Sequence, residues 1–587
     1  MTDAGTTAPT PPPPPPPPTG AEFLAHALVS EGVDRFFMVP GGHNDPFMSP
    51  MSRTPGLHTL VAAHEGGAAF MADGYARATG RLGAVFGIGG PGITNMATAL
   101  ASARVDGSAV IAISGEVPTA WEGQGGFQDA SGPDLDDVAA MRAVCTFSTR
   151  VESPAALPPM LREALTSARD HKAPAHLSIP LDVQRAPQPA DWSTLPPPVD
   201  RMNFVDEDAL DRTLSAIAEG HPNIVLLVGP GIRHGLAVDA LRTTAETWNL
   251  PVATTLSAKG VLPEDHPLAL GVFGYGGNRW ATEALLSGEV DILIVVGAAL
   301  TQRDTLQWDR RMLPRRTLVH VGADPSNLTR TWMPDVAVFG APETFLRKLA
   351  AADGLASRAL QAGFGRRAEF MDRLRASGPF AYDVDSRLST QVPLHPAAVI
   401  HAAREVYPRD AVAVVDSGAH RAFAAQHWVA YGPRDYLSAT NFGPMGAAVP
   451  LAIGSAAARP ELPHVVFAGD GCLLMHGMEL HTAARYGLPL VVVAMDNQSY
   501  GNIWYRAHEL GAAEAALTDI PGVDWATFGQ AMGVPTETIR TADDLRPAFD
   551  RALKRNGPCL VDARVDKTAS KPIAPWTAAV REWEDNH

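Results

Sequence analysis

Residues 469–501 read GDGCLLMHGMELHTAARYGLPLVVVAMDNQSYG, and this stretch decides the fold that the rest of the chain is expected to follow. The apolar run that leads into Gly469 and the run LPLVVVAM at 488–495 are typical of buried strands, and apolar residues recur between them at helical spacing. The stretch therefore predicts a strand–helix–strand unit, in which both strands end at the same edge of a parallel sheet. Asp470 and Asn497 each follow one of these strands, so we expect them to meet at that edge.

Oxygen ligands of the kind that Mg²⁺ prefers are present at this predicted meeting point. Asp470 offers a carboxylate, Asn497 offers a side-chain carbonyl, and Ser499 is the expected source of a backbone carbonyl. A Mg²⁺ ion held in this way usually also contacts a diphosphate. A GDG turn alone is more often an ordinary glycine-rich turn, and it is the amide after the next strand that favours a metal site.

The GDG turn, followed one strand–helix–strand later by Asp496-Asn497, resembles the thiamin diphosphate motif of the acetolactate synthase and 2-oxoacid decarboxylase superfamily. In that superfamily the motif ends in Asn-Asn and the second Asn supplies the metal ligand, so Asp496 departs from the pattern at the less important position. The resemblance extends over residues 21–567 and implies thiamin diphosphate and Mg²⁺ as cofactors.

Length and composition exclude several other classes of protein. A chain of 587 residues is too long for one core. Its formal net charge of −16 argues against nucleic acid or an anionic membrane as a partner. Cys145, Cys472 and Cys559 are scattered without a CxxC pair, which fits a reducing compartment. No apolar run approaches the ~18 residues of a membrane span, and the N-terminus is not typical of a signal peptide, so we expect a cytoplasmic protein.

Alternating strand-like and helix-like segments predict an α/β protein with three doubly wound parallel-sheet domains. The expected divisions are a disordered proline-rich tail at 1–20, a pyrimidine-binding domain at 21–190, a central domain at 203–351, a helical connector at 352–392 and a diphosphate-binding domain at 393–587. The unbroken proline run at 11–18 forms a stiff extended segment, for which docking to a proline-reading domain is the alternative to a disordered tail.

Glu65 is the expected acid of the first domain. It stands where an extended segment meets a predicted helix, a place at which a carboxylate is commonly only a partner of the helix dipole. However, EGGAAFMADGYARATG at 65–80 followed by GGPGITN at 89–95 resembles the pyrimidine-binding domain of the superfamily. There the Glu hydrogen-bonds N1′ of the aminopyrimidine and favours the imino tautomer that removes the proton from thiazolium C2. The resemblance assigns this role to Glu65.

Three more residues of this domain are implied in the reaction pocket. Gly126-Phe127-Gln128-Asp129 resembles the AFQE or AFQD segment that lines the pocket opposite C2 in relatives, which points to Phe127 and Gln128. His43, in PGGHND, occupies a loop that also faces the thiazolium in relatives. It either moves a proton near pH 7 or only shapes the pocket.

Cofactor contacts are also implied in the third domain. The turn Asp416-Ser417-Gly418-Ala419-His420 follows a predicted strand, and in relatives the matching turn and its His contact the diphosphate. Gly443-Pro444-Met445-Gly446 resembles the segment whose apolar side chain lies between the two cofactor rings and bends the cofactor, although such a Met is elsewhere a core filler. The expected cofactor-binding residues are Gly418, His420, Met445, Gly469, Gly471 and Cys472.

The central domain carries mixed signals about flavin. Residues 251–271 resemble the central domain of acetolactate synthases, which binds FAD in some members. Two departures weigh against FAD: the family's GxRFDDR reads GAALTQR at 297–303, and Leu181 stands where flavin-dependent synthases typically carry Lys. Arg303, the one arginine retained, fits the residue that anchors a 2-oxoacid carboxylate. The alternative for Arg303 is a surface ion pair with Asp304 or another neighbour.

The resemblance implies a carboligase similar to acetolactate synthase, which decarboxylates a 2-oxoacid such as pyruvate and transfers the acyl-anion unit to a second carbonyl. The alternatives are a non-oxidative 2-oxoacid decarboxylase, a 2-hydroxyacyl-CoA lyase, or a carboligase with another donor or acceptor. A non-catalytic regulatory homologue should have lost Glu65 or the metal ligands. Because the Glu of one subunit faces the diphosphate site of another in this superfamily, we expect a homodimer or homotetramer.

Overall fold

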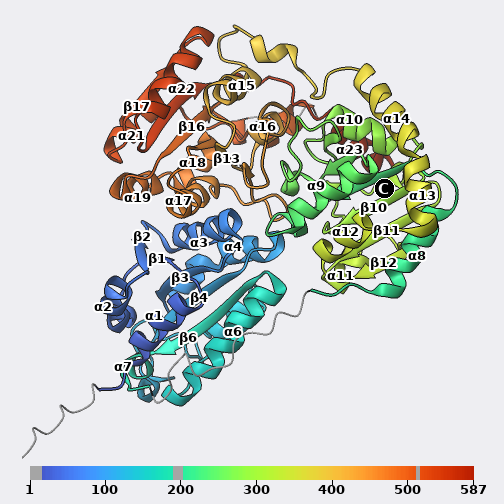
Figure 1. Cartoon of the computed structure of the whole chain (residues 1–587). Helices are drawn as coiled ribbons and strands as arrows, with labels where there is room; N and C mark the ends of the chain where they lie inside the picture. Colours follow the sequence, from blue (N-terminus) through green and yellow to red (C-terminus); the bar gives the residue numbers. More distant parts are fainter. Residues whose placement is uncertain (1–15, 189–202, 510–515, 587) are drawn as a thin grey trace, which may run out of the picture.

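Three six-stranded sheets organise the computed structural model, which describes residues 16–188, 203–509 and 516–586 (Figure 1). All neighbouring strands within each sheet run parallel, and helices cover both faces. This confirms the predicted α/β class with three doubly wound sheets. Most of the predicted proline-rich tail, residues 1–15, and residues 189–202, at the boundary between the expected first and central domains, lie outside the described residues.

The first sheet has the strand order β2-β1-β3-β4-β6-β5. Its strands are β1 Arg35–Met38, β2 His58–Val61, β3 Gly83–Ile88, β4 Val110–Glu116, β5 Phe147–Arg150 and β6 Pro174–Pro180. The helices around it are α1 Gly20–Ser30, α2 Asp45–Arg53, α3 Glu65–Thr79, α4 Pro91–Asp106, α5 Asp137–Arg142, α6 Leu157–His171 and α7 Leu181–Arg185, with the short turns η1 Gly42–Asn44 and η2 Thr119–Trp121. The order reverses between β1 and β3, so the turns after these two strands flank the crevice where open α/β sheets bind ligands.

The third sheet repeats this topology, with the order β14-β13-β15-β16-β18-β17. Its strands are β13 Val412–Val415, β14 Tyr436–Leu437, β15 His464–Gly469, β16 Leu490–Asp496, β17 Thr536–Ile539 and β18 Cys559–Arg564. Its helices are α15 Pro396–Val406, α16 Ala419–His427, α17 Ala448–Ala458, α18 Asp470–His476, α19 Glu479–Tyr486, α20 Gly501–Glu509, α21 Trp525–Ala531 and α22 Leu545–Lys554. Here the reversal lies between β13 and β15.

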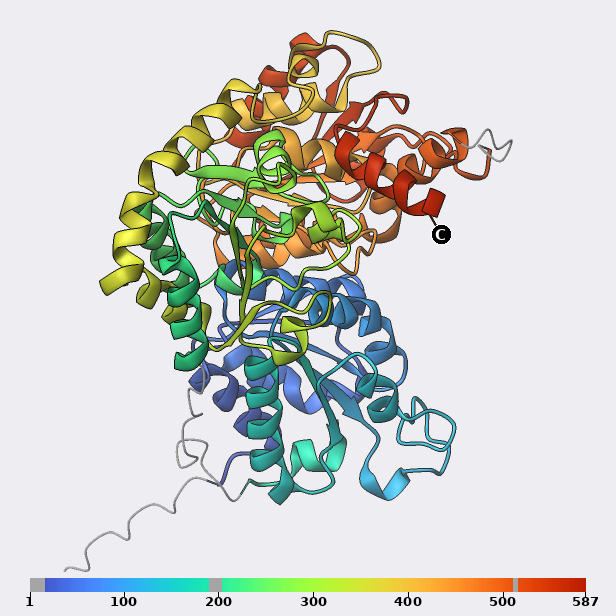
Figure 2. The same cartoon turned by 90° about the vertical axis from the view of Figure 1, so that its right-hand side faces the viewer.

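The central sheet has a different order, β12-β11-β10-β7-β8-β9. Its strands are β7 Ile224–Val228, β8 Val252–Thr254, β9 Ala269–Val272, β10 Ile292–Val296, β11 Thr317–Gly322 and β12 Val336–Phe339, and its helices include α8 Glu207–Ala218, α9 Ala237–Trp248, α10 Arg279–Leu286 and α12 Pro342–Ala350. Helices α13 Gly354–Ala362 and α14 Phe364–Ala376 run along one side of the molecule (Figure 2) and bury Leu360 and Phe370 against the central cores. The C-terminal helix α23 Ala574–Asn586 packs on the same domain through Ala579.

The predicted strand–helix–strand unit is present, with one correction. Strands β15 and β16 are parallel neighbours, with Gly469 opposite Met495, as expected. The connection, however, contains two helices, because α18 ends at His476, with Gly477 as its C-cap, and α19 begins at Glu479. The break changes which side chains face inward: Leu474 and Met478 are each 53% exposed, whereas Leu473 and Leu480 are buried.

Helices α3 and α17 join the first and third domains by direct backbone contact. A Cβ atom at Gly74 would lie 2.1 Å from the carbonyl oxygen of Leu451, and one at Gly454 would lie 1.8 Å from that of Met71. Side chains from both domains form one continuous hydrophobic cluster around this contact. The two glycines therefore fix how closely the two domains pack.

We expect alanine at either glycine to force α3 and α17 apart. Gly74→Ala and Gly454→Ala should each lower the free energy of unfolding by about 1–3 kcal/mol or more, because the atoms in the way are backbone. The control is Gly365→Ala in α14, where the space is open and alanine should be neutral or stabilising by up to ~1 kcal/mol. Denaturant unfolding that finds the three variants alike would contradict this account.

No helix in the described ranges combines the length and the apolar character needed to cross a membrane.

Candidate active site

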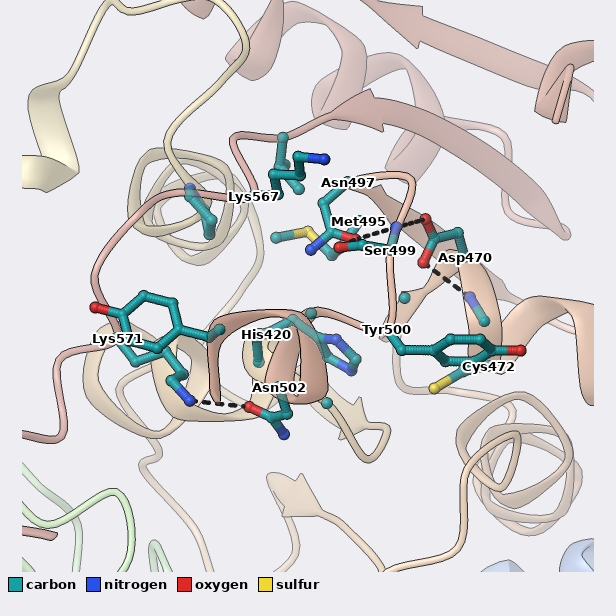
Figure 3. Close-up of a pocket in the computed structure, with 18 of the residues that line it drawn as sticks. His420, Asp470, Cys472, Met495, Asn497, Ser499, Tyr500, Asn502, Lys567 and Lys571 are labelled. Carbon is teal, nitrogen blue, oxygen red and sulfur yellow. Dashed lines mark hydrogen bonds between the residues drawn. The ribbon is translucent and has the colours of Figure 1, made fainter. Parts of the chain in front are cut away.

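A cavity of about 250 Å³ lies at the carboxyl edge of the third sheet (Figure 3). It is enclosed by the turns that follow β13, β15 and β16, by Met445, and by the segment that follows β18. Nine of the residues predicted from the sequence line it: Gly418, His420, Met445, Gly469, Asp470, Gly471, Cys472, Asn497 and Ser499. The reversal of strand order between β13 and β15 explains why these distant segments converge here.

Asp470 and Asn497 meet through Ser499. The backbone N–H of Ser499 donates both to Asp470 Oδ2 and to Asn497 Oδ1, at 3.1 Å in each case, and the Ser499 hydroxyl donates to Asn497 Oδ1 at 3.2 Å (Figure 3). The second carboxylate oxygen of Asp470 accepts from the N–H of Gly471 at 2.8 Å. The two predicted oxygen ligands therefore lie side by side at one point of the cavity.

The electrostatics of this point favour a bound cation. Burial raises the pKa of Asp470, and the nearby carboxylate of Asp496 raises it further. Asp496 is itself paired with Arg564, whose Nη1 donates to it at 3.0 Å. The carboxylates of Asp470 and Asp496 therefore repel each other, and Arg564 offsets only one of the two charges. A divalent cation at Asp470 would relieve that repulsion.

The opposite requirement, an anion, is met beside the same point. Helices α16 and α20 both begin at the cavity, so their N-terminal amides and dipoles favour negative charge there. Burial and the adjacent Arg421 lower the pKa of His420 to about 3, so its imidazole is neutral. Its buried Nε2 has no hydrogen-bond partner among the described residues and is available to a ligand.

Asp416, which the sequence analysis included only as part of a turn, holds Met445 in place. Its buried carboxylate accepts hydrogen bonds from the N–H groups of Ser417, Gly446 and Ala448, and so ties the segment that carries Met445 to the end of β13. The Cys472 thiol donates to the carbonyl oxygen of Ser417, and burial raises its pKa well above the usual range, which keeps the thiol protonated.

The other predicted catalytic residues gather at the carboxyl edge of the first sheet. Glu65 begins α3 and accepts a hydrogen bond from Asn95 Nδ2 of α4 at 3.0 Å. Gln128 adopts a left-handed backbone with φ of 59° and its carbonyl lies against the turn before α4, next to the 84% exposed side chain of Phe127. His43 lies in η1, after β1, and burial lowers its pKa.

The described chain does not bring these two sets together. All described residues that line the cavity belong to the third domain, so Glu65, Phe127, Gln128 and His43 lie outside it. Arg303 is also outside the cavity. Its guanidinium stacks over the Tyr275 ring at 4.5 Å instead of pairing with Asp304, whose carboxylate accepts from Thr301.

Glu116 is a buried carboxyl group at the edge of the first sheet that the sequence analysis missed. It ends β4, and its Oε1 accepts from the N–H groups of Val117 and Ala130, which fixes the loop that carries Phe127 and Gln128. Burial, with a contribution from Asp137 that exceeds the opposing effect of Arg150, raises its pKa to about 7. A charged residue directly after an apolar strand was the signal that could have found it.

This pKa predicts a pH-dependent contribution to stability. Because the folded protein holds a proton on Glu116 that the unfolded chain releases above its ordinary pKa of 4.5, stability should fall as the pH rises from 4.5 to 7. Glu116→Gln removes this loss and should gain about 2–3 kcal/mol relative to the wild type between pH 5 and pH 8. A difference in unfolding free energy that stays constant with pH would refute the prediction.

Comparison with known proteins agrees with this architecture domain by domain. Three family models match: the N-terminal TPP binding domain of thiamine pyrophosphate enzymes at residues 18–139, their central domain at 210–349 and their C-terminal TPP binding domain at 416–563. The chain is 30% identical over 571 residues to the acetolactate synthase isozyme 2 large subunit of Escherichia coli, which covers 95% of this chain and 97% of that protein. It is 29% identical over 578 residues to a probable acetolactate synthase large subunit of Methanocaldococcus jannaschii, covering 95% and 93% of the two chains.

The fold, the cavity and these similarities define a thiamine pyrophosphate-dependent enzyme, and the chain belongs to that family. Within the family its similarity is to acetolactate synthase large subunits, so it is an acetolactate synthase-like enzyme.

Proposed function

We propose that this enzyme is a Mg²⁺-dependent carboligase that decarboxylates a pyruvate-like 2-oxoacid and transfers the acyl-anion unit to a second carbonyl. The observation that carries the proposal is the convergence of Asp470 and Asn497 with two helix N-termini in one cavity. Full-length similarity to acetolactate synthases supports the reaction type.

The third domain would hold the metal and the diphosphate. Mg²⁺ would bind Asp470, Asn497 and the carbonyl oxygen of Ser499. No cluster of three or more His, Cys, Asp or Glu side chains in the described ranges could hold a metal, so the ion would complete its shell with phosphate oxygens and water. The diphosphate would bind His420 and the backbone amides of the remaining predicted contacts, Gly418, Gly469, Gly471 and Cys472. Met445 would pack between the cofactor rings.

Bound thiamin diphosphate supplies a carbon nucleophile that adds to a ketone and accepts the electron pair left when CO₂ departs. Glu65 would hydrogen-bond the pyrimidine ring and control its protonation. Phe127, Gln128 and His43 would line the substrate side, where His43 is neutral near pH 7 because its pKa is lowered. Arg303 would hold a substrate carboxylate through its Nη1, which has no hydrogen-bond partner among the described residues.

A second copy of the chain is needed to complete this site. Among the described residues, none of the first domain lines the cavity, and exposed apolar side chains lie beside it on α18 and just after it, namely Leu474, Met475 and Met478. We therefore propose a homodimer, or a homotetramer built from such dimers, in which the first domain of the partner subunit covers the cavity. Exposed apolar groups of this kind mark interaction surfaces.

Flavin is not part of the proposal. The glycine turn after β7 is filled by the chain itself, since a Cβ atom at Gly229 would lie 2.4 Å from Cα of Ala298 and one at Gly231 would lie 2.8 Å from Cα of Gly297. Packing within the central sheet therefore accounts for these glycines without a dinucleotide. We also propose a cytoplasmic location, supported by the three cysteines, which are buried and unpaired.

Product analysis tests the reaction. With pyruvate, thiamin diphosphate and Mg²⁺, the wild type should form acetolactate and CO₂, and Glu65→Gln should lower kcat by roughly 10²–10⁴-fold because it removes the acid–base group. The exposed variant Glu152→Gln is the matched control. Acetaldehyde alone would indicate a decarboxylase. Untouched pyruvate with bound cofactor would point to another donor, such as a 2-hydroxyacyl-CoA, and would remove the synthase assignment.

Mixing two inactive variants tests the shared site. Glu65→Gln and Asp470→Asn chains that are dissociated and reassociated together should recover about a quarter of the wild-type activity, since half of the dimers are mixed and each has one intact site. If both residues act within one chain, the mixture stays as inactive as its components, and the dimeric site is wrong.

A further inference from the structure

Side chains of the third domain hold the segment that leads into Glu65. This segment, residues 61–64, joins β2 to α3. The N–H of Val61 donates to the Tyr486 hydroxyl at 2.7 Å, and the N–H groups of Ala63 and His64 donate to Glu479 Oε2 and Oε1, both at 3.1 Å. Both acceptor residues lie on α19 of the same chain. The backbone that presents Glu65 is therefore shaped by another domain.

Burying the carboxylate of Glu479 is energetically unfavourable if the residue only fills space. It is only 1% exposed, its remaining hydrogen bond comes from the Thr482 hydroxyl at 2.6 Å, and the described residues form no ion pair with it. Burying a carboxylate without a cation is unfavourable unless hydrogen bonds replace its water, and burial accordingly raises the pKa of Glu479. An apolar residue would fill the space at lower cost, so the two backbone hydrogen bonds explain why a carboxylate is present.

The same carboxylate touches the first turn of α3. A Cβ atom at Gly67 would lie 2.0 Å from Glu479 Oε1, so only glycine lets α3 start this close to the carboxylate. The positive end of the α3 dipole is thereby placed against a negative group. His64 is the N-cap residue of the helix, with Nδ1 accepting from the N–H of Gly66 at 3.0 Å.

These contacts leave the start of α3 with one orientation. Glu479 contacts both the extended segment before α3 and the first turn of α3. Glu65 lies where the two meet, and its own carboxylate accepts a hydrogen bond from Asn95. A catalytic group displaced by about 1 Å can lose on the order of 10²-fold in rate.

We propose that Glu479 is a positioning residue for Glu65, which it orients by accepting the backbone hydrogen bonds of Ala63 and His64. The inference rests on the proposed acid–base role of Glu65 and adds the residue that sets its direction. Glu479 acts through the backbone of its own chain and touches neither substrate nor cofactor.

Glu479→Gln is the decisive variant, because it keeps the shape but turns one acceptor into an NH₂ group that faces a backbone N–H. In the protein without cofactor, amide hydrogen exchange in a peptide covering residues 61–67 should accelerate. With Mg²⁺ and thiamin diphosphate but no substrate, exchange of the cofactor C2 proton with D₂O should slow by roughly 10–100-fold. The dissociation constant of thiamin diphosphate should change by less than about 3-fold, since the third-domain ligands are untouched.

Two further variants separate positioning from folding. Glu479→Asp retains the charge but withdraws it by one methylene group, so its C2-proton exchange should lie between those of the wild type and Glu479→Gln. If Glu479→Gln does not fold, Glu479→Asp is compared with the wild type in its place. His481→Gln, at an exposed position on the same helix, should match the wild type in all three measurements.

C2-proton exchange that remains within about 2-fold of the wild type in Glu479→Gln would overturn the inference. A parallel loss of melting temperature, cofactor affinity and exchange would also overturn it, by making Glu479 a residue of the fold alone. If the wild type itself does not accelerate C2-proton exchange above free cofactor, the proposed role of Glu65 fails first, and the two failures are thereby told apart.

Discussion

The backbone contact between α3 and α17 constrains most of the molecule. Because Gly74 and Gly454 carry no side chains, the two helices approach until main-chain atoms touch, and the hydrophobic clusters of the first and third domains become one. A contact of this kind has little freedom to slide. Helix α3, which begins at Glu65, is therefore fixed against the domain that contains the cavity.

Parallel topology concentrates polar groups that cannot be satisfied elsewhere. Strands that all end at one edge bring backbone amides, helix N-termini and the residues after each strand to the same place. In the third domain this arrangement places a buried pair of carboxylates, Asp470 and Asp496, next to amides that favour an anion. The carboxylates favour a cation and the amides favour an anion, so the proposed magnesium diphosphate would supply both charges. The site thus draws its specificity from the fold before any single side chain is considered.

The local sequence predicted those features that depend on a single pattern, such as an apolar run that forms a buried strand. The apolar runs around Asp470 and Asn497 predicted neighbouring parallel strands, and the hydrogen bonds through Ser499 confirm that the two side chains meet. The break at Gly477 was missed because helical spacing continues across it.

The structural roles of the buried carboxylates were also not predicted from the sequence. Asp416, Glu116 and Glu479 each accept amides from segments remote in sequence or from turns whose conformation is set by tertiary packing, and a single sequence contains no pairing information of that kind. The separation of the first-domain residues from the cavity could be expected only from the resemblance. The spacing of residues in a sequence does not show whether two side chains act in the same subunit or in different subunits.

The first and third sheets share one strand order, and each carries its part of the proposed site at its carboxyl edge. One architecture has thus been used twice within a polypeptide, with the acid placed on one copy and the cation site on the other. Covalent linkage guarantees that both parts are made in equal numbers, whatever the level of synthesis. In the proposed dimer it does not bring them together, so a newly made or strongly diluted chain could hold its cofactor and still be unable to turn over substrate. Catalytic capacity would then depend on the concentration of the chain as well as on its amount.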